Sequence, residues 1–277
     1  FSHYKFEGEC PNKPAVAMEV NDVYPKEWLP FLRESLDEST LKDPIAWSKA
    51  CVEKHGADAI FFDMTGTHQD KQNVSPKDAA KTLNEILSSV EVPVIARAAG
   101  NFDKQNEVIT ECSEYASRQI VLGSAVQDNY RTITVAALAA GHYILAESPI
   151  DVNIAKQLNI LITQMNFPIE KIIIDPLTGG LGYGLEYTYS VMERIRLQAF
   201  GGDKLMLPSM VCCVGQETWK IKEVKLEDKN MGDQLARGIN WEVTTAISLI
   251  LSGANMVVVR HPESVKLVKK FIDSIFK

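Results

Sequence analysis

Short apolar runs rich in β-branched residues alternate with amphipathic segments along the whole chain. Runs that are apolar on both faces are typical of strands in a parallel sheet, which is covered on both sides. Eight such runs occur, at residues 15–20, 59–64, 93–98, 120–125, 143–148, 171–176, 207–212 and 255–261. The pattern therefore predicts eight strands, each followed by helical sequence.

The segments between the runs carry local signals for helix starts. Asp43 before Pro44 and Ser75 before Pro76 each place a capping side chain ahead of a proline at the first helical position. Residues 151–165 show apolar side chains at helical spacing. These signals predict helices that begin at residues 44 and 76, and a further helix over residues 151–165.

Eight strand–helix units over roughly 250 residues are the signature of a (β/α)8 TIM barrel. An open doubly wound sheet is the alternative, but it usually has fewer strands and a glycine fingerprint after the first one. The first run is followed instead by "NDVYPKEWLPFLRESLDEST". We predict a single TIM-barrel domain at residues 15–277, preceded by an N-terminal arm at residues 1–14.

Charge and composition exclude several classes of function. The 277 residues carry a net charge of −7, whereas nucleic acid and anionic membranes both attract concentrated Lys and Arg. The longest apolar stretch, "TTAISLILSGANMVVV", is interrupted by polar residues and predicts no membrane span. The opening "FSHYKFEGEC" lacks the apolar core of a signal peptide, so we expect a cytoplasmic protein. The start at Phe1 suggests that some N-terminal sequence is missing or was removed.

The cysteines and histidines indicate no metal site. Five scattered cysteines without a Cys-x-x-Cys pair argue for reduced thiols and against a resident iron–sulfur cluster or structural zinc. The five histidines form no ligand cluster either. Cys212 and Cys213 are adjacent in a predicted strand, so one should point into the barrel and the other outward. A redox disulfide between them is the rarer alternative.

In a TIM barrel the functional face is formed by the carboxyl ends of the strands and the loops that follow. Those positions hold mostly polar side chains: Glu19, Asp22, Asp63, Thr65, Arg97, Asn101, Ser124, Asp128, Asn129, Glu147, Asp151, Asn153, Asp175, Arg260 and His261. Asp63, Glu147 and Asp175 could supply acid–base pairs, or could instead form ion pairs with Arg97 or Arg260. Such a mouth suits a large polar ligand held by many hydrogen bonds.

One loop is unusually rich in glycine, in the stretch "DPLTGGLGYGLEYTYS" at residues 175–190. Its spacing matches neither the dinucleotide fingerprint nor a nucleotide-binding P-loop. The glycines could permit a tight strand-to-helix turn, or could let the backbone approach a ligand closely.

The sequence also resembles a known family over nearly its whole length. "FEGE", "MEVND", "SAVQDNYRTI", "SPIDVNIAKQLNIL", "GDKLMLPSM", "VGQETWKIKE" and "VVVRHPESV" occur in order and fall largely in the predicted barrel loops. With the glycine-rich stretch, they resemble the small subunit of the corrinoid iron–sulfur protein. That subunit is also called the delta subunit of acetyl-CoA decarbonylase/synthase.

The resemblance implies a (β/α)8 barrel that pairs with a larger gamma subunit, which carries a [4Fe–4S] cluster and a cobalamin-binding domain. The corrinoid would lie against the barrel mouth and carry a methyl group in the reductive acetyl-CoA pathway. The implied partners are a methyltetrahydropterin methyltransferase and acetyl-CoA synthase/CO dehydrogenase. This chain lacks the Asp-x-His-x-x-Gly motif of corrinoid ligation, so it would cover the cofactor without binding cobalt and contribute no catalytic residue.

On this resemblance we predict that the corrinoid contacts one set of mouth residues: Thr65, Asn129, Asp151, Asn153, Thr178, Gly179, Gly180, Gly182, Tyr183 and Gly184. Two alternatives stay open. One is a pterin-dependent methyltransferase with its own active site, in which Asp63, Asp151, Asn153 and Asp175 bind the pterin. The other is a purely architectural subunit.

Overall fold

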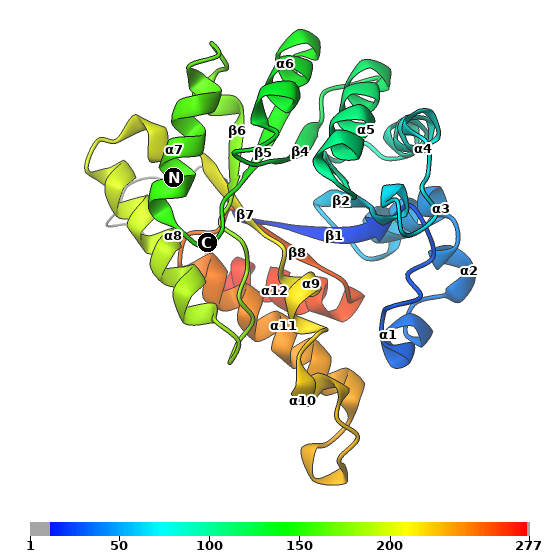
Figure 1. Ribbon diagram of the computed structural model, residues 1–277. Coiled ribbons are helices and arrows are strands. Elements are labelled where there is room, and N and C mark those ends of the chain that lie inside the picture. The colour runs from blue at the N-terminus through cyan, green and yellow to red at the C-terminus, as the bar shows by residue number, and fades with distance from the viewer. Residues whose placement is uncertain (1–11, 276–277) are drawn as a thin grey trace.

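The computed structural model describes residues 12–275, and its eight strands close into one parallel barrel (Figure 1). The strands are β1 Ala15–Asn21, β2 Ala59–Met64, β3 Val94–Ala98, β4 Val121–Ala125, β5 Tyr143–Glu147, β6 Ile172–Asp175, β7 Ser209–Cys212 and β8 Met256–Val259. Each strand pairs with the next along the chain, and β8 pairs with β1. The (β/α)8 prediction is confirmed, and every predicted strand overlaps an observed one.

Helices surround the barrel and connect consecutive strands. They are α1 Pro30–Glu34, α2 Glu38–Leu41, α3 Pro44–Lys49, α4 Pro76–Ser89, α5 Phe102–Tyr115, α6 Tyr130–Ala140, α7 Val152–Thr163, α8 Leu185–Phe200, α9 Val214–Thr218, α10 Lys222–Lys225, α11 Gln234–Leu251 and α12 Pro262–Ile275. A π-helical turn, η2 Ala50–Lys54, extends α3. Short 3-10 turns complete the set: η3 Thr65–Thr67, η4 Ile169–Lys171, η5 Lys204–Met206 and η6 Lys229–Met231.

The predicted capping residues begin their helices as expected. The Asp43 side chain accepts hydrogen bonds from two backbone N–H groups of α3, and Ser75 accepts one from α4. Asp151, which was predicted only as a mouth residue, caps α7 in the same way, with two N–H donors. These bonds satisfy N–H groups that a helix cannot pair internally, which explains why the starts could be located from sequence.

The alternation of side chains along each strand divides the core in two. One cluster fills the barrel interior and includes Ala17, Phe61, Leu145 and Cys213. The larger cluster lies between the outer face of the strands and the helices. Because successive strand residues point to opposite faces, Cys212 packs outward near Met192 while Cys213 points inward, as predicted. Both are free thiols, so they form no disulfide.

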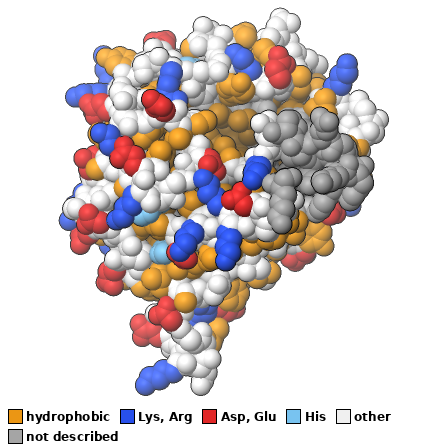
Figure 2. Space-filling model, turned by 180° about the vertical axis from the view of Figure 1, so that it is seen from behind, with side chains coloured by type: hydrophobic (Ala, Val, Ile, Leu, Met, Phe, Trp, Pro, Cys, Tyr) orange, Lys and Arg blue, Asp and Glu red, His pale blue; other side chains and the backbone are white. Residues whose placement is uncertain are grey.

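Two connections at the mouth are longer than a simple turn. The segment after β1 folds into α1 and α2, and its Trp28 packs edge-on against Trp47 at 5.4 Å between ring centroids. The segment after β7 contains α9 and α10, and the chain around α10 extends away from the barrel (Figure 1). Lys, Arg, Asp and Glu side chains are interspersed over the face shown in Figure 2.

Two predictions concern the ends of the chain and the membrane. Most of the predicted N-terminal arm, residues 1–11, lies outside the residues that the structure describes. Within residues 12–275, none of the helices combines the length and the apolar character needed to cross a bilayer.

Candidate functional site

Two neighbouring pockets open at the carboxyl ends of the strands. Pocket A has a volume of about 350 Å³ and is lined by Asp63, Thr65, His68, Lys71, Arg97, Ala98, Ala99, Gly100, Phe102, Gln105, Ser124, Val126 and Glu147. Pocket B has a volume of about 410 Å³ and is lined by Glu19, Asn21, Glu27, Trp28, Leu29, Asp63, Thr65, Arg97, Gln216, Trp219, Lys220, Lys225 and Arg260. Three residues, Asp63, Thr65 and Arg97, line both. The two pockets are therefore adjoining parts of one mouth.

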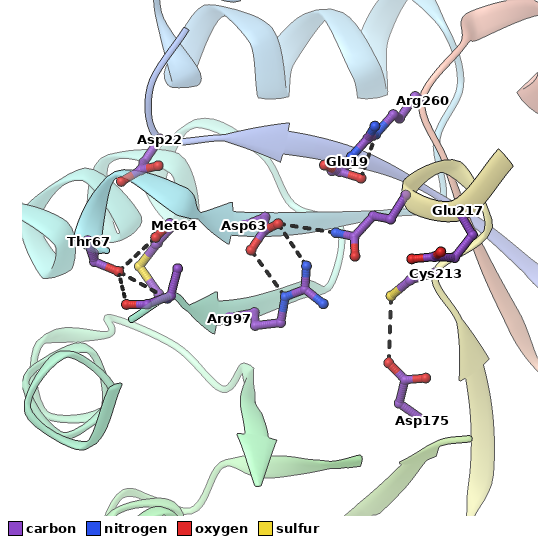
Figure 3. A network of polar contacts seen from close by, with 12 residues as sticks. Glu19, Asp22, Asp63, Met64, Thr67, Arg97, Asp175, Cys213, Glu217 and Arg260 are labelled. Carbon is purple, nitrogen blue, oxygen red and sulfur yellow. Dashed lines mark hydrogen bonds and ion pairs between the residues drawn. The ribbon is translucent and has the colours of Figure 1, made fainter. Parts of the chain in front are cut away.

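An ion pair lies where the pockets meet (Figure 3). Arg97 on β3 donates to both carboxylate oxygens of Asp63 on β2, at 3.1 and 2.8 Å, and Gln216 on α9 donates to the same carboxylate at 3.1 Å. The guanidinium also lies 4.9 Å from the centre of the Phe61 ring. The charge of Asp63 is thus balanced by Arg97, and its geometry is fixed from β2, β3 and α9.

A second bidentate ion pair forms one wall of pocket B. Arg260, after β8, donates to both carboxylate oxygens of Glu19 on β1, at 3.0 and 2.9 Å, and lies 4.5 Å from the Trp28 ring centre. The backbone N–H of Arg260 donates at 2.7 Å to Glu242, a fully buried residue of α11. Glu242 also accepts from Trp219 Nε1 at 2.9 Å. This one carboxylate thus holds both the second ion pair and an aromatic wall of pocket B in place.

Two carboxyl groups near the mouth hold protons more tightly than usual. Burial, with the nearby Glu147, raises the pKa of Asp175 from 3.8 to about 7. Its Oδ1 accepts from the backbone of Leu177, and its Oδ2 lies 3.7 Å from Cys213 Sγ. Burial also raises the pKa of Asp22 to about 6, against the hydrogen bond from Gly66 that lowers it. These raised pKa values bring both groups toward neutral pH, but neither residue lines pocket A or pocket B.

Several buried polar atoms at the mouth lack a hydrogen-bond partner within the part of the chain that the structure describes. They belong to residues at or just after strand ends: Asn21, Asp22, Thr65, Ser124 and Ser148. An unpaired buried polar group costs about 1–3 kcal/mol, so native structures hold few of them. Other unpaired buried atoms lie away from the mouth, on residues such as Arg118, Asn159 and Arg237. The mouth is therefore marked as the binding face by its two pockets together with these atoms, and not by the atoms alone.

The residues predicted to contact a corrinoid lie around this face but do not form one pocket. Thr65 lines both pockets. Asn129 is buried before α6, where its side chain bonds the backbone of Ser124 and Val126. Asp151 caps α7, and Asn153 is exposed in its first turn. Of the four residues predicted for a pterin, Asp63 lines the pockets, whereas Asp151, Asn153 and Asp175 line neither.

The glycine-rich loop between β6 and α8 is folded onto its own chain. A Cβ on Gly179 would lie 2.4 Å from the backbone of Gly184, so this close approach requires glycine. Gly182 and Gly184 have φ angles of 77° and 95°, which other residues rarely adopt. Trp241 and Thr245 of α11 anchor the loop through Leu181.

The glycine count thus has a structural explanation, and contact of the loop with a ligand stays a prediction. Thr178, Gly179 and Gly180 are buried, whereas Gly182 and Tyr183 are exposed at the tip. Tyr183 donates to Glu223 at 2.8 Å. The loop lines neither pocket.

Sequence reasoning missed Asn21 and Gln216. Asn21 lies two residues beyond Glu19 on β1, and the period of two that points Ala17 into the barrel also points Asn21 inward. That signal was present in the sequence. Gln216 lies on α9, a short helix whose contact with Asp63 spans 153 residues, and no local pattern indicates it. His261 is buried at 8% exposure and lines neither pocket; burial lowers its pKa to about 4.

Solved structures of dihydropteroate synthases share this fold. The enzyme from Xanthomonas albilineans, in complex with 7,8-dihydropteroate, has a TM-score of 0.65 and 13% identity, and the match covers 96% of this chain and 95% of that one. The enzyme from Thermus thermophilus has a TM-score of 0.62 and 12% identity, with 98% of each chain covered. At such low identity the likeness shows the fold alone. Fold and site together define a single-barrel TIM protein with a polar carboxyl-terminal mouth.

Sequence comparison identifies the family within this class. A family described as the CO dehydrogenase/acetyl-CoA synthase delta subunit matches residues 2–271. A relative from Methanosarcina mazei, the acetyl-CoA decarbonylase/synthase complex subunit delta, is 35% identical over 96% of this chain. The corresponding subunit of Methanothermobacter thermautotrophicus is 33% identical over 96%. The chain belongs to this delta-subunit family, which confirms the resemblance. It spans 62% of the length of the Methanosarcina mazei relative and 69% of the other.

Proposed function

We propose that this chain is the small subunit of a corrinoid iron–sulfur protein within an acetyl-CoA decarbonylase/synthase system. Its barrel mouth would cover a cobalamin held by a larger gamma subunit, which would also carry the [4Fe–4S] cluster. The pair would carry a methyl group between a methyltetrahydropterin methyltransferase and acetyl-CoA synthase/CO dehydrogenase, in the cytoplasm. The observation that carries the proposal is the family match, which runs from residue 2 to residue 271 and so includes all eight strands.

The residues at the mouth fit a corrinoid as a ligand. A corrin ring is broad, and its rim bears neutral carboxamides that donate and accept hydrogen bonds. The mouth offers matching unpaired groups, the Asn21 amide and the hydroxyls of Thr65 and Ser124. Its strongest charges are balanced within the chain by the Asp63–Arg97 and Glu19–Arg260 pairs. The mouth thus offers neutral hydrogen-bonding groups beside ion pairs whose charges cancel. Such a surface suits the neutral carboxamides around a corrin ring.

The chain would act by holding and shielding the cofactor. The cofactor supplies the methyl-transfer chemistry when bound. Trp28 and Trp219 line pocket B and are themselves almost fully buried. Trp28 is fixed by Trp47 and Arg260, and Trp219 by Glu242. A rigid closed barrel beneath these side chains keeps the mouth in one shape while a mobile partner domain approaches and withdraws.

The metal content of the chain and its partner tests the proposal. The chain would be produced alone and together with the predicted large subunit, and each preparation analysed for cobalt, iron and visible absorbance. We expect cobalt and iron to travel with a one-to-one pair and the isolated chain to be colourless. Within residues 12–275, no three His, Cys, Asp or Glu side chains gather as a metal site would require.

The same preparations test the methyltransferase alternative. If the isolated chain binds methyltetrahydropterin and methylates free cob(I)alamin, the covering function fails and the chain is an enzyme in its own right. If the chain pairs with the large subunit, but the large subunit binds the corrinoid equally well when this chain is absent, the chain is architectural.

A further inference from the structure

Asn21 at the end of β1 is a buried amide without a partner. Its side chain is 1% exposed and lines pocket B. Neither Nδ2 nor Oδ1 has a hydrogen-bond partner among the described residues, whereas Glu19, the preceding inward residue of β1, is paired with Arg260. The amide therefore combines an unused donor and an unused acceptor on one small planar group.

Such an arrangement does not help the free protein to fold. A buried amide without partners loses its bonds to water and gains none in return. Leucine has nearly the same size and would fill the position without that loss. Residues that bind a ligand are often less stabilising in the free protein than an apolar residue would be. An unpaired asparagine at the wall of a pocket fits this description.

The walls of pocket B define the shape of the missing partner. Trp28 and Trp219 line the pocket but are only 4% and 3% exposed, so each ring offers it little free surface. Both rings are held in place, Trp28 by edge packing on Trp47 and Trp219 by a hydrogen bond to Glu242. The pocket volume of about 410 Å³ admits one planar ring system or one short side chain.

The charges around pocket B define the polarity of the partner. Two buried acidic residues, Glu19 and Asp63, are each neutralised by an arginine. At the exposed rim Lys220 is paired with Glu217 and Glu27 with Lys71, whereas Lys225 has no ion pair among the described residues. The buried floor therefore demands no charged partner, and a neutral hydrogen-bonding edge meets the Asn21 amide best.

We propose that pocket B is a recognition site for a neutral amide edge, in which an N–H and a C=O lie side by side on one plane. Asn21 Oδ1 would accept from the N–H, while Nδ2 would donate to the C=O. Two sources offer this edge: a peripheral carboxamide of a corrinoid, or the lactam of a free bicyclic heterocycle of the pterin type. The first source rests on the proposed function, and the second does not.

Equilibrium dialysis of the full chain against two probes tests the proposal. Dicyanocobinamide carries the ring carboxamides of a corrinoid without its nucleotide tail, and pterin carries the lactam alone. Their absorbance and fluorescence report free ligand directly. We expect at least one probe to bind and Asn21→Leu to weaken it about tenfold or more, because two hydrogen bonds are lost. Asn21→Ala removes the same atoms but leaves room, and should weaken binding to a similar extent.

Two control variants separate recognition from a structural role. Asn240→Leu makes the same change at an exposed position of α11 outside the pocket and should bind as the unmodified chain does. Asn159→Leu replaces a buried asparagine whose Nδ2 donates to the backbone oxygen of Leu205 at 2.8 Å. Because that hydrogen bond is lost, this variant should have a lower melting temperature. Asn21→Leu, without ligand, should match or exceed the melting temperature of the unmodified chain.

Each outcome decides the proposal. It is overturned if neither probe binds, if both Asn21 variants bind like the unmodified chain, or if Asn21→Leu loses as much stability as Asn159→Leu. Cobinamide binding that is insensitive to Asn21 would leave the covering function standing and remove this site. Pterin binding alone, lost in the Asn21 variants, would support the site and weaken the case for a corrinoid at this pocket.

Discussion

The buried carboxyl group of Asp175 should make the stability of the protein depend on pH. The residue is 1% exposed at the end of β6, and burial together with Glu147 raises its pKa to about 7. In the unfolded chain the carboxyl titrates near its ordinary value of 3.8. Between these two values the folded protein holds a proton that the unfolded chain releases, so this group makes stability fall as pH rises.

The magnitude follows from the difference between the two pKa values. Each pH unit in that interval corresponds to about 1.4 kcal/mol, so the total loss from pH 4 to pH 8 is about 4 kcal/mol. Asp175→Asn keeps an oxygen that can accept from the backbone of Leu177 and removes the titration. The difference in free energy of unfolding between the variant and the unmodified chain should therefore be about 2 kcal/mol more in favour of the variant at pH 8.5 than at pH 5.5.

Urea unfolding at the two pH values measures this difference. Asp128→Asn makes the same change at an exposed position after β4 and controls for the substitution itself. An equal effect of Asp175→Asn at both pH values, or a loss of stability at pH 8.5, would refute the reasoning. It would mean that Asp175 is ionised in the folded protein and stabilised by its surroundings.

Three further predictions concern stability and can be read from urea unfolding of the full chain. Gly179→Ala should lower the free energy of unfolding by about 3 kcal/mol, because the added methyl group meets the backbone of the same loop. Gly182→Ala, with φ of 77° and open space around it, should lower it by about 1 kcal/mol, and equal losses would contradict the close approach at Gly179. Glu242→Leu should cost about 3 kcal/mol by leaving buried donors unpaired, and a neutral result would show that water replaces the carboxylate. Arg97→Met should lower the free energy of unfolding by about 3 kcal/mol, because the buried Asp63 carboxylate loses its counter-charge. Restored stability in the double variant Arg97→Met with Asp63→Leu would confirm that cause.

Much of the architecture was accessible from sequence because its causes are local. Strands of a parallel barrel are covered on both faces, so they appear in the sequence as apolar runs. Asp43 and Ser75 cap helices within their own segments. The outcome for Cys212 and Cys213 followed from the strand period alone. In each case the deciding neighbours lie within a few residues along the chain.

The candidate site was predicted only as a face of the barrel. The sequence indicated that polar side chains follow the strand ends, and Thr65 was placed correctly at the mouth. It did not predict that Asp151 would be engaged as a helix cap or that Gly179 would pack on its own loop. A residue type that suits a ligand suits a cap or a tight turn equally well, and only the folded backbone distinguishes these uses.

The sequence by itself determined the order of strands and helices, the helix starts, the polar character of the mouth and, through its resemblance, the family. Only the tertiary structure decided which charges neutralise one another and which polar groups stay unpaired. Arg260 meets Glu19 across 241 residues because barrel closure places β8 beside β1. Asn21 lies at the same closure, and the side chains around it come from both ends of the chain. Such contacts depend on the geometry of the closed barrel, which no local pattern of residues records.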